Sequence, residues 1–232
     1  MRTEGTGVNG REILVQKFGG TSLADLRGFE ASAGVIAQYV GDRQVVVVLS
    51  AVKGVTDLLL AAIDTAVAGE DGAVHLREAF ARQRAIVEEL AAQGVPTPEA
   101  SAFFAEQEEI VNRRIEGIRL LGQCPDEARA RILASGEGFS SRLMVDVLNH
   151  QGVRAQWSDA DVLPLANEDW LDSLVDIEAA GPLLRQRLQS GSQVLVLPGF
   201  YGRNAKGQIQ LLGRNGTDYS AAAVAAALGA GL

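Results

Sequence analysis

The stretch VQKFGGTS, residues 15–22, follows a short apolar run and precedes a helical pattern that starts at about Asp25. Two adjacent glycines let backbone N–H groups approach an anion without side-chain obstruction. The start of a helix adds a partial positive charge of roughly half an electron, and Lys17 adds a full charge. The residues therefore predict a buried strand, a phosphate-binding turn and a helix, although an ordinary turn with a surface lysine fits them too.

A second strand–loop–helix unit follows at a spacing that predicts a parallel sheet. We expect a helix over residues 23–40 and a strand at Val45–Leu49, whose β-branched run is typical of a strand covered on both faces. The loop SAVKGVTD, residues 50–57, then leads into a helical pattern over residues 58–67. In open parallel sheets ligands bind at the carboxyl ends of the strands, so we expect both loops at one site. Thr56 also fits a plain helix cap.

Two later motifs place charged side chains beside glycines. Glu137, in the motif SGE at residues 135–137, lies between two helical patterns. The motif GRNGTD, residues 213–218, enters an alanine-rich helix expected from about Ser220 to Leu228. The planar fork of Arg214 suits a carboxylate. Without further context, Glu137 also fits a favourable charge at a helix start, and the Thr-Asp pair at 217–218 fits helix N-capping.

These four motifs together resemble the signatures of the aspartate kinases in the amino-acid kinase family. KFGGTS at residues 17–22 resembles the opening signature, and residues 50–57 resemble the second. SGE is similar to the third motif, and GRNGTD is similar to G-R-G-G-S-D, with Asn215 and Thr217 in place of glycine and serine. The asparagine variant is similar to the bifunctional subgroup, in which a homoserine dehydrogenase follows the kinase.

The resemblance implies an α/β fold, a three-layer αβα sandwich with a mainly parallel central sheet. It implies phosphoryl transfer from ATP to the β-carboxylate of L-aspartate, giving 4-phospho-L-aspartate, the first step of lysine, threonine and methionine biosynthesis. Positioning and charge neutralisation dominate such chemistry, and Mg²⁺ would arrive with ATP rather than in a dedicated protein site. The alternative is a non-catalytic amino-acid-binding or assembly module with the same fold.

The resemblance also implies a role for each motif residue. Lys17 would neutralise the transferring phosphoryl group, and Asp218 would orient Lys17. Glu137 would hold the ammonium group of aspartate and Arg214 its α-carboxylate. The residues expected at the phosphates are Lys17, Gly19, Gly20 and Gly216, and those expected at aspartate are Thr21, Ser22, Ser50, Thr56, Glu137, Arg214 and Thr217.

The rest of the chain is read as one kinase-type domain, residues 12–232, after a flexible extension at residues 1–11. Residues 73–121 show only helical periodicity, in two helices separated at about residues 94–98. The remaining predicted elements are strands at 153–157, 194–197 and 208–212, a helix at 177–188 and a turn at 204–207. Because a doubly wound domain normally continues past its last helix into another strand, we expect a C-terminally truncated fragment with little kinase activity of its own.

Composition restricts the partners of this chain. Its 232 residues carry a formal net charge of −8, which disfavours nonspecific binding to nucleic acid or to an anionic membrane. One cysteine excludes an internal disulfide, and two histidines far apart make a zinc site improbable. No apolar run is long enough to span a membrane, and the first ten residues lack a signal-peptide core. We therefore expect a cytoplasmic protein, and the family implies a homo-oligomer.

Overall fold

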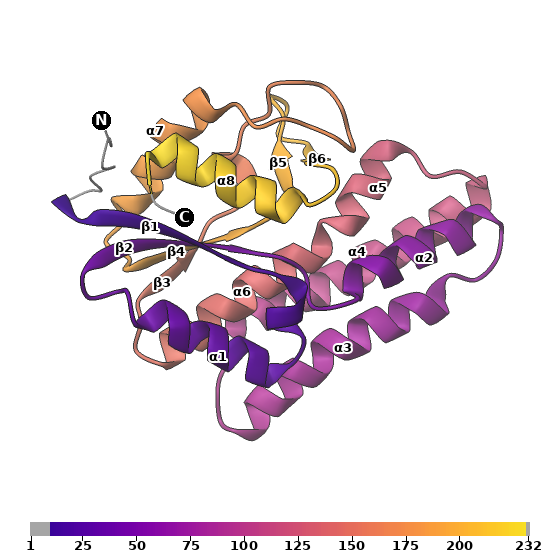
Figure 1. Cartoon of the computed structure of the whole chain (residues 1–232). Helices are drawn as coiled ribbons and strands as arrows, with labels where there is room; N and C mark the ends of the chain where they lie inside the picture. The colour runs from indigo at the N-terminus through magenta and orange to yellow at the C-terminus, as the bar shows by residue number, and fades with distance from the viewer. Residues whose placement is uncertain (1–9, 231–232) are drawn as a thin grey trace.

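A computed structural model describes residues 10–230 of the chain (Figure 1). Most of the predicted N-terminal extension, residues 1–9, lies outside the described residues. The centre of the fold is a parallel sheet in the order β1-β2-β4-β3. Its strands are β1 (Glu12–Phe18), β2 (Arg43–Leu49), β3 (Ala155–Trp157) and β4 (Val194–Pro198).

Helices cover both faces of this sheet, which gives the expected three layers (Figure 1). In β2, Val45 and Val47 face one hydrophobic core, while Val46 and Val48 face the other. This alternation follows from the period of two residues along a strand. The first core packs against α1 (Leu26–Ala37), α2 (Val55–Val67), α3 (Ala73–Ala92), α4 (Pro98–Leu121), α5 (Asp126–Leu133) and α6 (Ser135–His150); the second packs against α7 (Ile177–Leu188) and α8 (Gly216–Leu228).

A small antiparallel hairpin follows β4. Its strands are β5 (Tyr201–Arg203) and β6 (Ile209–Leu211). The Oδ1 atom of Asn204 accepts hydrogen bonds from the backbone N–H groups of Lys206 and Gln208, both at 3.0 Å, which closes the predicted turn. The hairpin brings the chain back toward the sheet, so that α8 begins near the carboxyl ends of the strands (Figure 1).

The predicted elements are confirmed, with four differences at helix starts. Helix α2 begins at Val55 rather than at residue 58. The helix expected over residues 23–40 is a 3₁₀ turn, η2 (Gly20–Leu23), followed by α1, because the Asp25 carboxylate accepts from the Gly28 N–H at 2.9 Å and starts a new helix. Helix α6 begins at Ser135, since Ala134 is itself helical and joins α5 to α6 almost without a break. Helix α8 begins at Gly216 rather than Ser220, directly after the left-handed Asn215.

The long helical region also agrees with its prediction. Helices α3 and α4 form a hairpin that projects beside the sheet and packs against α2 (Figure 1). Within residues 10–230, the structure contains no helix that combines the length and the apolar character needed to cross a bilayer.

Candidate active site

Lys17 and Asp218 form an ion pair at the carboxyl end of β1. The Nζ atom of Lys17 lies 2.8 Å from Oδ1 of Asp218, although some 200 residues separate them in sequence. Lys17 is near the end of β1, and Asp218 is in the first turn of α8, so the two elements bring together the residues that the sequence predicted as the catalytic pair. The Lys17 side chain is 28% exposed and that of Asp218 is 64% exposed, so a ligand can reach both.

The two glycines of the first loop place backbone close to this lysine and to the second loop. A Cβ atom added to Gly19 would lie 3.1 Å from Nζ of Lys17, so the ammonium group lies directly over this glycine. A Cβ atom added to Gly20 would lie 3.2 Å from the carbonyl oxygen of Ala51 and close to the backbone of Lys53. The two loops therefore meet at one edge of the sheet, as predicted, and a side chain at Gly20 would press on the backbone of the second loop.

Glu137 is buried beside the second loop with an incompletely satisfied carboxylate. Its side chain is 2% exposed, and its Oε2 atom has no hydrogen-bond partner among the described residues. Burial raises the pKa of Glu137 to about 8, while the backbone N–H groups of Glu137 and Ala51 act in the opposite direction. The N–H of Glu137 lies in the first turn of α6, so its effect agrees with a favourable charge at a helix start, but burial outweighs it. A buried acceptor of this kind suits a ligand with a donor group.

Ser50 links the second loop to α6. Its backbone N–H donates to the carbonyl of Phe18 at 3.1 Å, and its carbonyl accepts from the Ser140 hydroxyl at 2.7 Å. The same hydroxyl lies 2.9 Å from the carbonyl of Gly136. This network fixes the first turn of α6, which carries Glu137, against the end of β2.

The start of α8 packs against the loop that follows β4. A Cβ atom on Gly199 would lie 2.6 Å from the Thr217 methyl carbon and 3.1 Å from the Thr217 Cα. One on Gly216 would lie 2.8 Å from the Phe200 ring. Gly216 and Thr217, both predicted as ligand-binding residues, are buried in this contact.

Phe200 is a strained residue beside the start of α8 that the sequence did not single out. It has a positive φ of 71°, which is rare for a bulky side chain, and the only other described non-glycine residue with a positive φ is Asn215. The Phe200 N–H donates to the Ser220 hydroxyl at 3.0 Å, which holds the strained residue against α8. Strained backbone of this kind clusters at functional sites, and no local sequence signal predicts it.

The remaining predicted residues lie around the site without contacts that connect them to it. Thr21 and Ser22 are exposed in the 3₁₀ turn η2, and Arg214 is exposed in the loop before α8. Thr56 is half-buried in the first turn of α2. Within residues 10–230, no hydrogen bond or ion pair joins the side chains of these four residues to Lys17, Glu137 or Asp218.

The capping roles that the sequence left open are not observed. The residue before α2 is Gly54, in the left-handed region with φ of 77°, and no side chain caps the helix. The residue before α8 is Asn215, also left-handed, again without a side-chain cap. Thr56, Thr217 and Asp218 therefore lie within helices instead of capping them.

The geometry suits an anionic ligand at Lys17 and a cationic group at Glu137. Lys17, the glycine backbone and the start of η2 provide positive charge, and Glu137 provides a buried acceptor. A groove of about 590 Å³ runs along β1 and is lined by Lys17 and Asp218 at one end. Within the described part of the chain, no group of three or more acidic, cysteine or histidine side chains is arranged to hold a metal ion.

Comparison with known proteins places this geometry in context. Residues 12–232 match the profile of the amino acid kinase family. The chain is 35% identical over 228 residues to bifunctional aspartokinase/homoserine dehydrogenase 2 of Escherichia coli, and the match covers 96% of this chain and 26% of that protein. It is 33% identical to lysine-sensitive aspartokinase 3 of the same organism, over 94% of this chain and 47% of that protein.

The solved structures agree with these sequence matches. The structure of Escherichia coli aspartokinase III in complex with aspartate and ADP superimposes with a TM-score of 0.80 at 31% identity, covering 94% of this chain and 47% of that one. The same enzyme in complex with lysine and aspartate gives a TM-score of 0.79. The chain thus spans between about a quarter and a half of the length of these relatives.

Proposed function

Because the chain belongs to the amino acid kinase family, we propose that it carries the phosphoryl-transfer site of an aspartate kinase. In this reaction a β-carboxylate oxygen of L-aspartate attacks the γ-phosphorus of ATP, and the bond from that phosphorus to the bridging oxygen breaks. The products are 4-phospho-L-aspartate and ADP. The proposed place of the reaction is the first step of lysine, threonine and methionine biosynthesis, in the cytoplasm.

The observation that carries the proposal is the Lys17–Asp218 pair above Gly19. Phosphoryl transfer needs little covalent help from the protein, but it needs positive charge placed where negative charge develops. Asp218 holds the Lys17 ammonium over the glycine backbone, which is the arrangement that neutralises a transferring phosphoryl group. Lys17, Gly19 and Gly20 would hold the phosphates of ATP, and Mg²⁺ would arrive bound to them.

The proposed substrate follows from Glu137 and Arg214. Glu137 offers a buried acceptor with no other partner in the described structure, which suits the ammonium group of an amino acid. Arg214, exposed before α8, would hold the α-carboxylate. Thr21, Ser22, Ser50, Thr56 and Thr217 are proposed to line the same pocket.

We also propose that the protein is a homo-oligomer. Support comes from β1, which is an edge strand of the four-stranded sheet. Uncovered edge strands favour association with a second chain.

Calorimetry with L-aspartate and with succinate tests the substrate assignment. Succinate has both carboxylates of aspartate but lacks the ammonium group, so the wild-type protein should bind aspartate more tightly. Glu137→Gln should weaken aspartate binding by about 2–5 kcal/mol, the range for breaking a desolvated charge pair, and should abolish the preference over succinate. Arg214→Ala should weaken the binding of both ligands. Glu109→Gln, an exposed change on α4, is the matched control.

Equal affinity of the wild type for aspartate and succinate would remove the ammonium-binding role of Glu137. The alternative function, a non-catalytic amino-acid-binding or assembly module, predicts aspartate binding without ADP formation. Measuring aspartate-dependent ADP release in the same preparation separates the two functions.

A further inference from the structure

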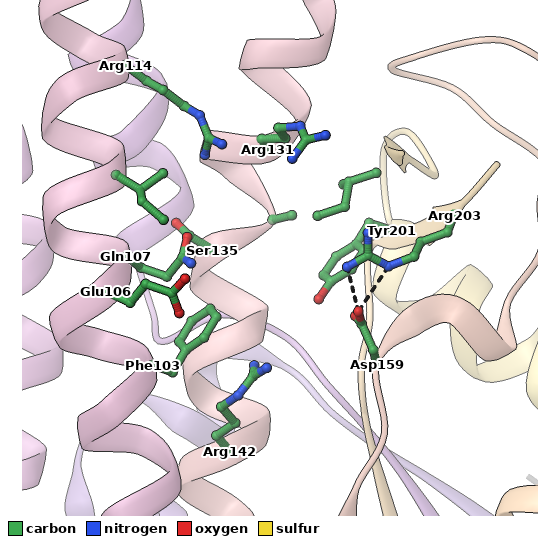
Figure 2. Close-up of a pocket in the computed structure, with 13 residues that line it drawn as sticks. Phe103, Glu106, Gln107, Arg114, Arg131, Ser135, Arg142, Asp159, Tyr201 and Arg203 are labelled. Atoms are coloured by element: carbon green, nitrogen blue, oxygen red, sulfur yellow. Dashed lines mark hydrogen bonds and ion pairs between the residues drawn. The ribbon is translucent and has the colours of Figure 1, made fainter. Parts of the chain in front are cut away.

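A second polar pocket lies on the other side of α6 from Glu137. It has a volume of about 240 Å³ and is bounded by α4, the end of α5, the start of α6 and the β5–β6 hairpin (Figure 2). We call it the arginine pocket, because Arg114, Arg131, Arg142 and Arg203 line it. Ser135 lines it as well. Residues two apart on a helix are rotated by about 200° and so lie on nearly opposite sides, which means that Glu137 faces away from this pocket.

Three of the four arginines have partners within the described residues. Arg131 forms an ion pair with Glu127 at 3.2 Å, and Nε of Arg203 donates to Asp159 at 2.9 Å. Arg142 donates to the carbonyl of Gly138 at 2.9 Å. Its guanidinium also lies over two aromatic rings, 4.0 Å from the Phe103 ring centroid and 3.5 Å from that of Trp157. These contacts hold three positive charges in place around the pocket.

Arg114 differs from the other three. It is half-buried, yet it forms no hydrogen bond or ion pair with any described residue. Burial and the positive charge of Arg131 lower the pKa of Arg114, and the negative charge of Glu127 only partly opposes this. Figure 2 shows the Arg114 side chain extending from α4 toward Arg131 across the top of the pocket. Arg114 has no ion pair of its own here, although Glu127, the partner of Arg131, also acts on its charge.

The acidic groups near the pocket do not remove this excess of positive charge. Glu106 on α4 and Asp159 also line it, and Asp159 is already paired with Arg203. Tyr201 adds a neutral hydroxyl, because burial raises its pKa far above the usual range. The four arginines outnumber the lining acids Glu106 and Asp159 together with Glu127, the partner of Arg131, so the surface is locally positive in a chain whose formal net charge is −8.

We propose that the arginine pocket binds a small oxyanion, a phosphate or a carboxylate group, between Arg114 and Arg131. The planar guanidinium fork matches the spacing of two oxygens in either group, and an anion there would relieve the repulsion between the two arginines. The volume of about 240 Å³ is below the usual range of roughly 300–1,000 Å³ for drug-sized ligands. The ligand is therefore a small metabolite or a single anionic group of a larger one.

The test compares two adjacent arginines on α4. Arg114→Gln removes the unpaired guanidinium, while Arg113→Gln removes the same charge from an exposed side chain that pairs with Glu109. Inorganic phosphate and succinate are titrated separately into the 232-residue wild type, into both variants and into Arg131→Gln, at constant ionic strength set with chloride. Binding is followed by the ¹⁵N–¹H signals of the arginine side chains and by the melting temperature.

We expect wild type and Arg113→Gln to bind at least one probe with equal affinity. Arg114→Gln and Arg131→Gln should bind that probe with an affinity lower by a factor of about ten or more. Any phosphate bound at Lys17 contributes equally to all four proteins, so the difference between the variants reports the arginine pocket alone. A phosphate-only or succinate-only response identifies the ligand class.

Equal binding by Arg113→Gln and Arg114→Gln, or binding of neither probe by the wild type, would overturn the proposal. The melting temperature without added anion gives a second criterion. Removing a repelled guanidinium should leave Arg114→Gln at least as stable as Arg113→Gln. A large loss of stability in Arg114→Gln alone would show that Arg114 supports the fold, and it would count against a ligand site.

Discussion

The ion pair of Lys17 with Asp218 affects the position of the ammonium group more than the stability of the fold. Asp218 is 64% exposed, and exposed ion pairs contribute only about 0–1 kcal/mol to the free energy of unfolding. The pair therefore contributes little to holding β1 and α8 together. Its clear structural effect is to keep the ammonium group over Gly19, where it faces solvent and any incoming ligand.

Lys17→Met should lower kcat by roughly 10²-fold or more in the catalytically active protein, because one preorganised cation is lost where negative charge develops. The KM for aspartate should change little, and the melting temperature should stay close to that of the wild type. Steady-state kinetics provide the measurement, with Lys206→Met, an exposed lysine in the β5–β6 turn, as the control. A Lys17→Met protein within a factor of two of wild-type kcat would exclude Lys17 from the mechanism.

At the scale of elements, two contacts between distant segments position the helices. No side chain of its own caps the start of α4, but the buried Asp146 of α6 accepts from the N–H groups of Glu99 and Ala100 at 3.3 and 2.9 Å. The start of α8 is placed by close backbone packing at Gly199. Both contacts depend on the packing of elements far apart in sequence, and the second one determines where Asp218 lies.

Gly199→Ala should destabilise the protein by about 1–3 kcal/mol, because the new Cβ would overlap the Thr217 methyl group and press on its Cα. The start of α8 would shift, so aspartate-dependent turnover should fall as well. Gly34→Ala is the matched control: its Cβ meets nothing within 4 Å in the exposed part of α1, and it should stabilise by roughly 0.5–1 kcal/mol. Chemical denaturation measures both changes, and equal stabilities would contradict the packing argument.

At the scale of the whole molecule, Glu137 couples the site to global stability. Its pKa is raised from 4.5 to about 8 in the folded protein, so between these values the folded state binds more protons than the unfolded state. The stabilising contribution of neutral Glu137 is complete below pH 4.5 and is lost as pH rises toward 8. A bound ammonium group would instead favour the charged carboxylate and lower its pKa.

The free energy of unfolding of the ligand-free protein should therefore fall between about pH 5 and 8, by up to about 1.4 kcal/mol per pH unit from this group. Glu137→Gln should show a flatter profile and should exceed the wild type in stability at pH 8. Saturating aspartate should stabilise the wild type more at pH 8 than at pH 5. Urea denaturation across this pH range gives the profile; parallel curves for wild type and Glu137→Gln would show that Glu137 is not the group responsible.

The sequence by itself determined the elements and the general position of the site. The β-branched run of β2, the two glycine loops and the helical periodicity of residues 73–121 are local patterns, and such patterns need only a few neighbouring residues to specify a strand, a turn or a helix. Because parallel strands end at the same edge, the pattern also predicted that the first two loops meet. The family motifs added the roles that we propose for Lys17, Glu137 and Asp218.

Only the tertiary structure decided how those residues meet and what surrounds them. The ion pair of Lys17 with Asp218, the burial that raises the pKa of Glu137, and the strained Phe200 all depend on elements far apart in the chain. The same is true of the arginine pocket, whose four cations come from three helices and a hairpin. Burial, electrostatic coupling and close packing are properties of the assembled chain, because each depends on every segment that excludes water from the site.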